Sequence, residues 1–328
     1  MRRPTSRARK LVAGVAALSA CALLLTGCGL RSASGAVLAA NPGSIQRYKS
    51  LEGVHLTVAA KDFTEQLILG NMMSTVLSTA GADVTNLSDT PGSFGVRQAL
   101  LKRDVDLSPE YTGTGWINYL GNTKPIKGTT AQYQAVYKAD LKNGLTWLPP
   151  APMNNTYAFA IREAKAKQLK ITKLSQLTKL PKKELTFCVE SEFAKRNDGF
   201  QPMLKTYGLS NATIAKATNL DTGVIYTATA DGGKCNFGEV FTTDGRIPGL
   251  HLRVLQDDKQ FFPLYNLSEV VQTSTLKKYP AISEIFAKIN PRLTNPTMLA
   301  LNAKVDVAGG DPAIVAKDWL VKEGFVKE

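Results

Sequence analysis

Several short segments of the chain place aromatic rings beside charged, hydroxyl and amide side chains. Each segment follows a stretch typical of a β-strand, and together they span residues 58–66, 106–115, 154–158, 190–199, 238–246 and 257–265. Ligands of α/β proteins bind beyond the carboxyl ends of such strands. A ring face attracts a cation, and a lysine, arginine or hydroxyl group can hold a carboxylate. These residue types therefore indicate a site that binds a small solute.

The sequence lacks the local motifs of common enzymes. It has no P-loop, no nucleophile elbow of the form GxSxG and no HExxH zinc motif. Its two histidines, His55 and His251, lie in or next to predicted strands, which favours a structural role, and no Cys/His cluster has metal-ligand spacing. We therefore expect no enzyme, no cofactor and no metal, although a carboxylate pair or a Ser–Lys site requires no local motif.

The N-terminus carries an export signal. Residues 2–10 are basic, residues 11–25 are apolar, and the run ends in LTGC at 25–28. An apolar run of this length is too short for a comfortable membrane span. LTGC resembles the lipobox of bacterial lipoproteins, in which the cysteine receives a diacylglycerol and becomes the first mature residue. The resemblance implies a signal peptide over 1–27 and a palmitate-bearing anchor on Cys28, which holds the protein on the extracytoplasmic face of the cell membrane. The alternative is an ordinary signal peptide with an unrelated cysteine.

The four cysteines differ in their expected fates. Cys21 leaves with the signal peptide and Cys28 carries the anchor. Cys188 and Cys235 then remain in an oxidising compartment, where disulfides persist. We predict that these two form a disulfide, which would stabilise the fold by roughly 4 kcal/mol in the chain-entropy model. The alternative is a pair of buried free thiols.

Composition and charge exclude two further classes of protein. Hydrophobic residues make up 44% of the 328 residues and charged residues 20%, which is typical of a globular protein and argues against a disordered or fibrous one. The formal net charge is +13, and the five basic residues that precede the apolar run account for part of it, leaving +8. The remaining basic residues are interleaved with acids and form no run with stacking aromatics, so we expect no nucleic-acid partner.

Strand and helix patterns alternate from about residue 51 onward. The strand at 56–60 precedes a helix that Asp62 and Thr64 would cap, with an apolar stripe at i+4 spacing and Gly81 at its end. Further strands are predicted at 84–87, 105–109, 157–161 and 185–189, and further helices at 96–103, 130–142, 200–207 and 311–324. The alternation predicts an α/β fold with largely parallel sheets. Because no linker interrupts the middle of the chain, we expect two lobes that exchange segments. Residues 28–50, rich in Gly, Ser and Ala, are expected to form a flexible tether.

The same segments, in this order, resemble a known family of transport proteins. The motifs are KDFTEQ at 61–66, PEYTGT at 109–114, NNTYA at 154–158, FTTDGR at 241–246 and DDKxFFPxY at 257–265. Together they resemble the substrate-binding proteins of osmoprotectant ABC importers, the ProX/OpuC type that binds glycine betaine, choline or carnitine. The resemblance runs from about residue 56 to 326. It implies a type II periplasmic-binding-protein fold, in which two α/β lobes are joined by two crossing strands with a ligand cleft between them.

The resemblance also implies the extent of the lobes and the partners of the protein. Residues 51–155 and 266–328 would form one lobe, and residues 156–265 the other. The protein would be a monomer that captures a small quaternary amine and delivers it to the permease and ATPase subunits of an ABC transporter.

Individual site residues follow from the positions that match the family motifs. The ligand-binding aromatic cage would consist of Tyr111, Tyr157, Phe241 and Tyr265, and the ligand carboxylate would be held by Lys61, Thr114 and Arg196, with Asn155 and Glu192 nearby. A trimethylammonium group has no N–H donor, so ring faces have to hold it. Phe241 stands where the family usually has tyrosine. The alternatives are core packing for the rings, a solvated surface position for Lys61 and a surface salt bridge for Arg196.

Two other functions remain open. One is a binding protein of the same fold for an amino acid, a polyamine or an aromatic compound. The other is a lipid-anchored hydrolase, against which the missing nucleophile motif argues.

Overall fold

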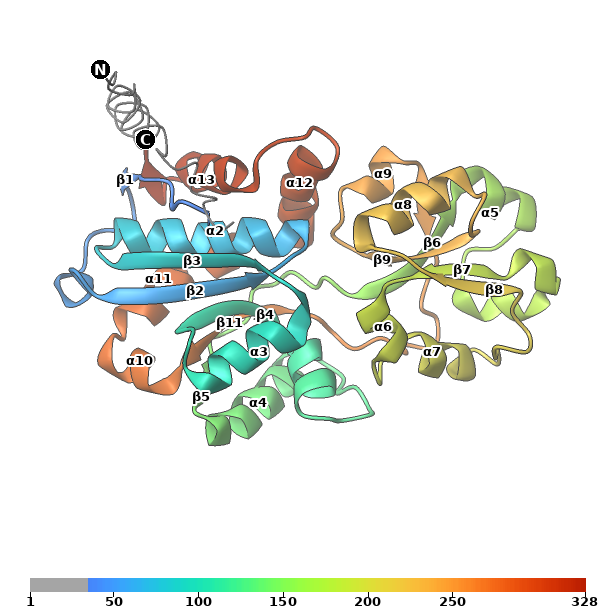
Figure 1. Ribbon diagram of the computed structural model, residues 1–328, viewed down its shortest axis with the longest axis horizontal. Helices are drawn as coiled ribbons and strands as arrows, with labels where there is room; N and C mark the ends of the chain where they lie inside the picture. The colour runs from blue at the N-terminus through green and yellow to red at the C-terminus, as the bar shows by residue number, and fades with distance from the viewer. Residues whose placement is uncertain (1–34) are drawn as a thin grey trace, which may run out of the picture. The chain divides into compact units, whose positions relative to one another are not determined.

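A computed structural model describes residues 35–328 of the chain (Figure 1). The predicted signal peptide, the predicted lipidation site at Cys28 and the first part of the predicted tether lie outside the described residues. Two five-stranded sheets, each with its own helices, form two lobes. The predicted α/β architecture of two lobes joined by two crossing segments is confirmed.

Lobe 1 is built on the sheet with strand order β3-β2-β4-β11-β5. Its strands are β2 (His55–Lys61), β3 (Asp83–Thr90), β4 (Leu107–Tyr111), β5 (Leu145–Trp147) and β11 (Leu267–Gln272). Its helices are α2 (Thr64–Thr79), α3 (Gly92–Lys102), α4 (Thr129–Asp140), α10 (Thr273–Lys278), α11 (Ala281–Ile289), α12 (Asn295–Asp306) and α13 (Pro312–Lys322), and a π-helical turn covers Thr114–Tyr119. Figure 1 shows α2 lying along β2 and β3, and α12 and α13 pack against α2.

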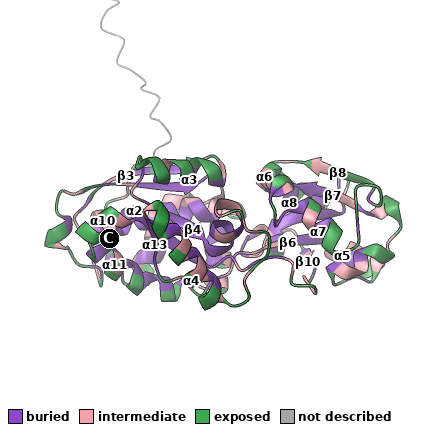
Figure 2. Cartoon of the chain, turned by 90° about the horizontal axis from the view of Figure 1, so that it is seen from below, coloured by how far each residue is buried: buried purple, intermediate pink, exposed green. Residues whose placement is uncertain are grey.

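Lobe 2 is built on the sheet with strand order β10-β6-β9-β7-β8. Its strands are β6 (Tyr157–Arg162), β7 (Thr186–Val189), β8 (Lys216–Asn219), β9 (Phe237–Phe241) and β10 (Leu252–Val254). Its helices are α5 (Glu163–Leu169), α6 (Ser191–Lys195), α7 (Phe200–Thr206), α8 (Thr222–Asp231) and α9 (Arg246–Gly249). Each lobe encloses an apolar core of its own, and Figure 2 shows the buried residues concentrated inside both.

The sheets are largely parallel, as predicted, but each contains one strand that runs against the others. Strand β2 runs parallel to β3 and β4, and β7 runs parallel to β8 and β9. Strand β11 is antiparallel to β4 and β5, and β6 is antiparallel to β9 and β10. The reason is the exchange of segments: β6 and β11 are reached from the other lobe, so they enter their sheets from the opposite end.

The two segments that cross between the lobes hydrogen-bond to each other. Asn154 and Asn266 form an isolated antiparallel bridge, and the Asn155 N–H donates to the Tyr265 carbonyl at 3.1 Å. The Asn154 side chain also accepts the Tyr265 N–H at 2.6 Å. The crossing is therefore a short two-stranded connection, and the residues on it are held at fixed positions between the lobes.

The composition predicted that residues 28–50 form a flexible tether, but residues 41–50 are packed against lobe 1. Strand β1 (Asn41–Pro42) pairs with β12 (Val326–Lys327) near the end of the chain. The N–H groups of Ser44 and Ile45 donate to the carbonyls of Gly324 and Phe325, and Ile45 is fully buried. Glycine and alanine content alone indicated flexibility, whereas one buried isoleucine and a short strand pairing fix the segment to lobe 1.

The predicted disulfide joins Cys188 of β7 to Cys235, which lies two residues before the start of β9. Because β7 and β9 are adjacent parallel strands, the two Cα atoms lie 5.7 Å apart, a spacing that suits a disulfide. Both cysteines are buried under α8, next to Ile225. The bond therefore ties two central strands of lobe 2. Among the described helices, none is both long and apolar enough to cross a bilayer.

Candidate functional site

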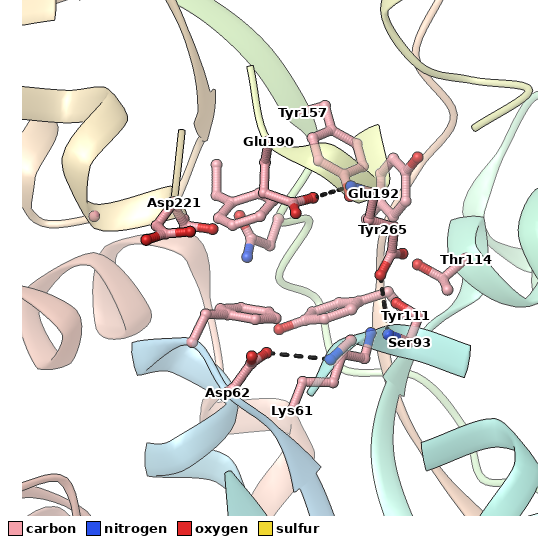
Figure 3. Close-up of a pocket in the computed structure, with 16 residues that line it drawn as sticks. Lys61, Asp62, Ser93, Tyr111, Thr114, Tyr157, Glu190, Glu192, Asp221 and Tyr265 are labelled. Atoms are coloured by element: carbon pink, nitrogen blue, oxygen red, sulfur yellow. Dashed lines mark hydrogen bonds between the residues drawn. The ribbon is translucent and has the colours of Figure 1, made fainter. Parts of the chain in front are cut away.

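A cavity of about 350 Å³ lies between the two lobes (Figure 3). Of the nine residues predicted to contact a ligand, eight line it: Lys61, Tyr111, Thr114, Asn155, Tyr157, Glu192, Phe241 and Tyr265. The ninth, Arg196, does not line this cavity. The remaining lining residues are Asp62, Phe63, Gly92, Ser93, Glu190, Asp221, Thr222 and Gly223.

Three of the four predicted cage residues lie at the ends of strands that meet at the cavity. Tyr111 is the last residue of β4 and Phe241 the last of β9, while Tyr157 begins β6 and is paired with Phe241 across the sheet. Tyr265 lies on the second crossing segment. The Tyr157 ring centroid is 5.2 Å from that of Phe241 and 5.3 Å from that of Tyr265, with the Tyr265 ring nearly perpendicular. The predicted rings therefore come together in one place.

Phe63 is a fifth ring of this cluster and was not predicted. Its centroid lies 5.1 Å from that of Phe241 and 6.4 Å from that of Tyr111, so it connects the ring from lobe 1 with the ring from lobe 2. The signal was present in the sequence, since Phe63 follows β2 inside the KDFTEQ segment. The segment was recognised there as part of the site, but only Lys61 in it was assigned to the ligand.

The start of α2 also differs from the prediction. Asp62 and Thr64 do not cap this helix, whose N-cap residue is Phe63 and has no side-chain capping bond. The Thr64 hydroxyl donates to Asp306 at 2.6 Å, and Asp62 accepts the Gly92 N–H at 3.3 Å. Both side chains therefore bond to distant parts of the chain, because the folded chain offers them partners that the local sequence does not contain.

Glu65 holds the most connected carboxylate near the cavity. One of its oxygens accepts the Tyr111 hydroxyl at 2.7 Å and the Asn155 amide at 2.8 Å. The other accepts the Thr243 hydroxyl at 2.5 Å and the Asn302 amide at 2.9 Å. Burial raises the pKa of Glu65, although the four hydrogen bonds oppose the shift. One side chain of α2 thus connects a cage ring, a crossing segment, lobe 2 and α12.

Lys61 lines the cavity with its ammonium already paired. Its Nζ lies 2.6 Å from a carboxylate oxygen of Glu110, and both side chains are buried. The same ammonium lies 5.1 Å from the centroid of the Tyr111 ring. Glu110 also accepts the Tyr111 N–H at 2.7 Å and the Tyr119 hydroxyl. The sequence could not predict this ion pair because Lys61 and Glu110 lie on different strands, β2 and β4.

Arg196 lies behind the rings, and its guanidinium is fully engaged with protein groups. It donates to both oxygens of Asp198, at 2.7 and 3.0 Å, and to Glu192 at 3.0 Å. It also donates to the Tyr265 hydroxyl at 3.3 Å, and its central carbon lies 5.3 Å from the centroid of the Tyr157 ring. The Tyr265 hydroxyl donates to Asp198. Arg196 therefore positions two cage rings from behind.

Glu192 links the two lobes beside the cavity. This residue of α6 accepts the backbone N–H of Ser93 in α3 at 3.0 Å and the side-chain amide of Asn118 at 3.4 Å. Burial alone would raise the pKa of Glu192, but the charges of Arg196 and Lys61 outweigh it and the pKa is lowered. The carboxylate is therefore ionised at neutral pH.

Two more acids, Glu190 and Asp221, line the cavity from lobe 2 and were not predicted as site residues. Glu190 precedes α6, and one of its oxygens accepts the N–H groups of Glu192 and Phe193. Asp221 precedes α8, and no capping bond ties its side chain to that helix. Within residues 35–328, no group of three or more His, Cys, Asp or Glu side chains is placed to hold a metal ion.

Comparison with protein families gives one match over most of the chain. Residues 54–322 match the model of the substrate-binding domain of ABC-type glycine betaine transport systems. The glycine-betaine-binding protein of Pseudomonas aeruginosa is 38% identical over 273 residues, which cover 81% of this chain and 86% of that protein. The ergothioneine transport permease/ergothioneine binding protein of Helicobacter pylori is 33% identical over 277 residues, which cover 84% of this chain but only 49% of that longer protein.

The solved structures agree with the sequence relatives. The ligand-free structure of YehZ from Escherichia coli superimposes with a TM-score of 0.64 at 30% identity, covering 83% of this chain and 99% of that one. The same fold is therefore found in a relative of known structure.

Proposed function

Because the chain belongs to the family of substrate-binding domains of ABC-type glycine betaine transport systems, we propose that it captures a small quaternary-ammonium osmolyte between its lobes. Glycine betaine, choline and carnitine are the candidates, and the protein delivers the captured solute to the permease of an ABC importer. The observation that carries this proposal is the convergence of Tyr111, Tyr157, Phe241 and Tyr265 on one cavity. Phe63 adds a fifth ring to this group.

The chemistry of the ligand explains why rings are needed. A trimethylammonium group spreads its positive charge over methyl groups and offers no N–H donor, so hydrogen bonds cannot hold it. The negative face of an aromatic ring can, at about 0.5 to 2 kcal/mol per ring once water is excluded. Phe241 provides a weaker face than a tyrosine and lacks the hydroxyl. We propose that it keeps the geometry of the cage while weakening one of its contacts.

Binding and release depend on the two lobes in this proposal. Tyr111 belongs to lobe 1, Phe241 to lobe 2, and Tyr265 to a crossing segment, so only a closed arrangement offers all rings to the ligand at once. The ligand therefore shifts the population toward the closed form. The permease and its ATPase supply the transport energy, and the role of this protein is binding, not catalysis.

Anchoring is the second part of the proposal. We propose that diacylglycerol on Cys28 holds the mature protein on the outer face of the cell membrane, as the lipobox-like LTGC indicates. Mass spectrometry of the mature N-terminus tests this proposal, since an unmodified N-terminus other than Cys28 contradicts it.

Calorimetry on the mature protein tests the binding function. Glycine betaine should bind with micromolar affinity while glycine, which lacks the methyl groups, should show no binding at the same concentrations. Equal affinity for the two compounds contradicts the cage. Affinity only for an unmethylated amino acid or a polyamine would assign the cavity to another class of solute. Ergothioneine should be tested beside these compounds, because the Helicobacter relative is an ergothioneine-binding protein.

A further inference from the structure

The side chains that line the cavity carry an excess of negative charge. Among the described residues, the carboxylates of Asp62, Glu190, Glu192 and Asp221 line it together with one basic residue, Lys61. Figure 3 shows Asp62 and Lys61 on one side of the cavity and Glu190 and Asp221 on the other. With these five groups ionised, the lining carries a net charge of −3. Such a lining attracts a cation and repels an anionic group.

The basic groups at the cavity are already neutralised by the protein. Lys61 is paired with Glu110 at 2.6 Å, and Arg196 donates to both oxygens of Asp198. The carboxylate of a zwitterionic ligand would have to compete with these buried acids for either cation. Removing one partner from a buried ion pair costs several kcal/mol. Neither residue is therefore a ready partner for a ligand carboxylate.

Other strong donors of the lining are also occupied by carboxylates of the protein. The Ser93 N–H donates to Glu192 at 3.0 Å, and the Gly92 N–H donates to Asp62 at 3.3 Å. The lining amide of Asn155 donates to the buried Glu65 at 2.8 Å. Neutral hydroxyls such as that of Thr114, which is buried in the lining, bind an anion more weakly than a charged donor does.

Two lining carboxylates are instead placed to accept a hydrogen bond from a ligand. Glu190 uses one oxygen for the N–H groups of Glu192 and Phe193, which leaves its second oxygen on the cavity side of lobe 2. Asp221 lines the cavity and makes no capping bond with α8. A hydroxyl group on a cationic ligand can donate to either acid, and a bond to a charged acceptor is the stronger kind.

From the charge, the occupied donors and the two acceptors, we propose that the cavity selects a singly charged quaternary-ammonium alcohol of the choline type over zwitterionic betaines. This proposal rests on the proposed function, because it assumes that the rings hold a trimethylammonium group. The rings bind that group in both classes of ligand. The difference arises at the other end of the molecule, where choline offers a hydroxyl and a betaine adds a carboxylate to an acidic lining.

Calorimetry at low ionic strength distinguishes the two ligand classes. We expect the mature protein to bind choline at least about tenfold more tightly than glycine betaine, which corresponds to about 1.4 kcal/mol. Tetramethylammonium, which has the charge but no hydroxyl, should bind between the two. Glycine betaine binding as tightly as choline, or more tightly, overturns this inference and leaves the proposed function intact. If none of the three compounds binds, the proposed function fails together with the inference.

Charge-neutralising variants test the cause of the preference. Asp221→Asn and Glu190→Gln should each weaken choline binding several-fold and leave glycine betaine binding unchanged or tighter. Because Asp221 makes no capping bond, Asp221→Asn should not disturb α8, which circular dichroism can verify. The matched control is Asp318→Asn, which removes the same charge from an exposed position of α13. A choline preference that survives in both cavity variants overturns the electrostatic explanation.

Discussion

At the residue scale, the rings around the cavity have unequal roles. Tyr111 faces the cavity from lobe 1, and its hydroxyl is fixed by Glu65 at 2.7 Å, so its position does not depend on the ligand. Loss of this ring removes the main aromatic face contributed by β4. The other rings are grouped around Tyr157, where neighbours lie within 5.3 Å and can partly fill the space of a missing member.

We therefore predict that Tyr111→Ala weakens binding of a trimethylammonium ligand by roughly 3- to 30-fold, as expected for about 0.5 to 2 kcal/mol per ring. Titration calorimetry with the preferred ligand measures the change. Tyr279→Ala, at the end of α10 and away from the cavity, is the control and should leave affinity unchanged. An effect of the control equal to that of Tyr111→Ala would move the binding site elsewhere.

Glu269 provides a second prediction at this scale, concerning stability. Burial raises the pKa of Glu269 to about 7, and its one side-chain partner is the Asn290 amide at 2.8 Å. An acid with a raised pKa holds its proton longer in the folded state than in the unfolded one. The folded protein is therefore favoured at low pH, and this contribution is lost as pH rises from about 4.5 through about 7.

Chemical denaturation at pH 5 and pH 8 checks the effect of Glu269→Gln. The wild-type protein should lose up to about 3 kcal/mol more of its unfolding free energy between these two pH values than the variant does. The comparison with the variant separates Glu269 from other buried acids such as Glu65. Identical pH profiles for the two proteins would show that Glu269 titrates normally in the folded state.

Much of the candidate site was predictable at the residue scale, whereas the pairing of its charged side chains was not. The family motifs, taken in their order along the chain, identified eight of the cavity residues. These motifs are short and lie next to strands, so they can be recognised from the sequence alone. Lys61 and Arg196 were expected to hold the ligand carboxylate, but each is paired with a carboxylate of the protein. For Lys61 that partner, Glu110, comes from another strand, and such pairings depend on which strands become neighbours.

At the element scale, the N-terminal segment of the described chain belongs to lobe 1. Ile45 is fully buried, and β1 closes onto β12 at the far end of the chain. Fully burying an isoleucine contributes about 1.5 to 3 kcal/mol. The segment therefore holds the C-terminal strand β12 in place, next to α13, which packs against α2.

We predict that a chain beginning at residue 51 unfolds at a lower temperature than one beginning at residue 35. The loss in unfolding free energy should be about 2 kcal/mol or more, measured by thermal and chemical denaturation. Ile45→Ala in the longer chain should reproduce most of it, whereas Gln46→Ala, an exposed neighbour, should not. If the two chains were equally stable, residues 41–50 would contribute nothing to folding and would act only as a tether.

The positions of most strands and helices followed from the sequence, but the direction of the one reversed strand in each sheet did not. Apolar periodicity and Gly stops depend on neighbours a few residues away, as in α2 with Gly81 after it. The direction of a strand depends on the end of the sheet at which the chain enters it. Strands β6 and β11 each begin after a crossing from the other lobe, which no local pattern records.

At the scale of the whole molecule, contacts between the lobes surround the cavity. The Thr243 hydroxyl of lobe 2 donates to Glu65 of lobe 1, and the Asn302 amide of α12 donates to the Thr243 carbonyl at 2.8 Å. Beside the cavity, Ser93 and Glu192 form a further contact. These bonds stabilise the closed arrangement, and their removal should favour an open one.

We predict that Thr243→Ala shifts the ligand-free protein toward larger separations of the lobes and weakens ligand binding by roughly 10- to 100-fold, the effect of losing one hydrogen bond to a buried carboxylate. Fluorescence energy transfer between dyes attached at Lys102 and Lys216 reports the separation. Thr227→Ala, on the exposed face of α8, is the matched control. An unchanged transfer efficiency together with unchanged affinity would show that this bond does not couple the lobes.

The buried disulfide of lobe 2 can report how often helix α8 moves away from the sheet. Cys188 is 0% and Cys235 1% exposed, and thiol–disulfide exchange requires an attacking thiolate to reach one of the sulfurs. A reductant in solution can therefore act only when α8 lifts from the strands beneath it. The rate of reduction by excess dithiothreitol would measure how often that opening occurs. Because Asp221 is the residue that directly precedes α8, a ligand that contacts Asp221 should hold the helix in place and slow the reduction.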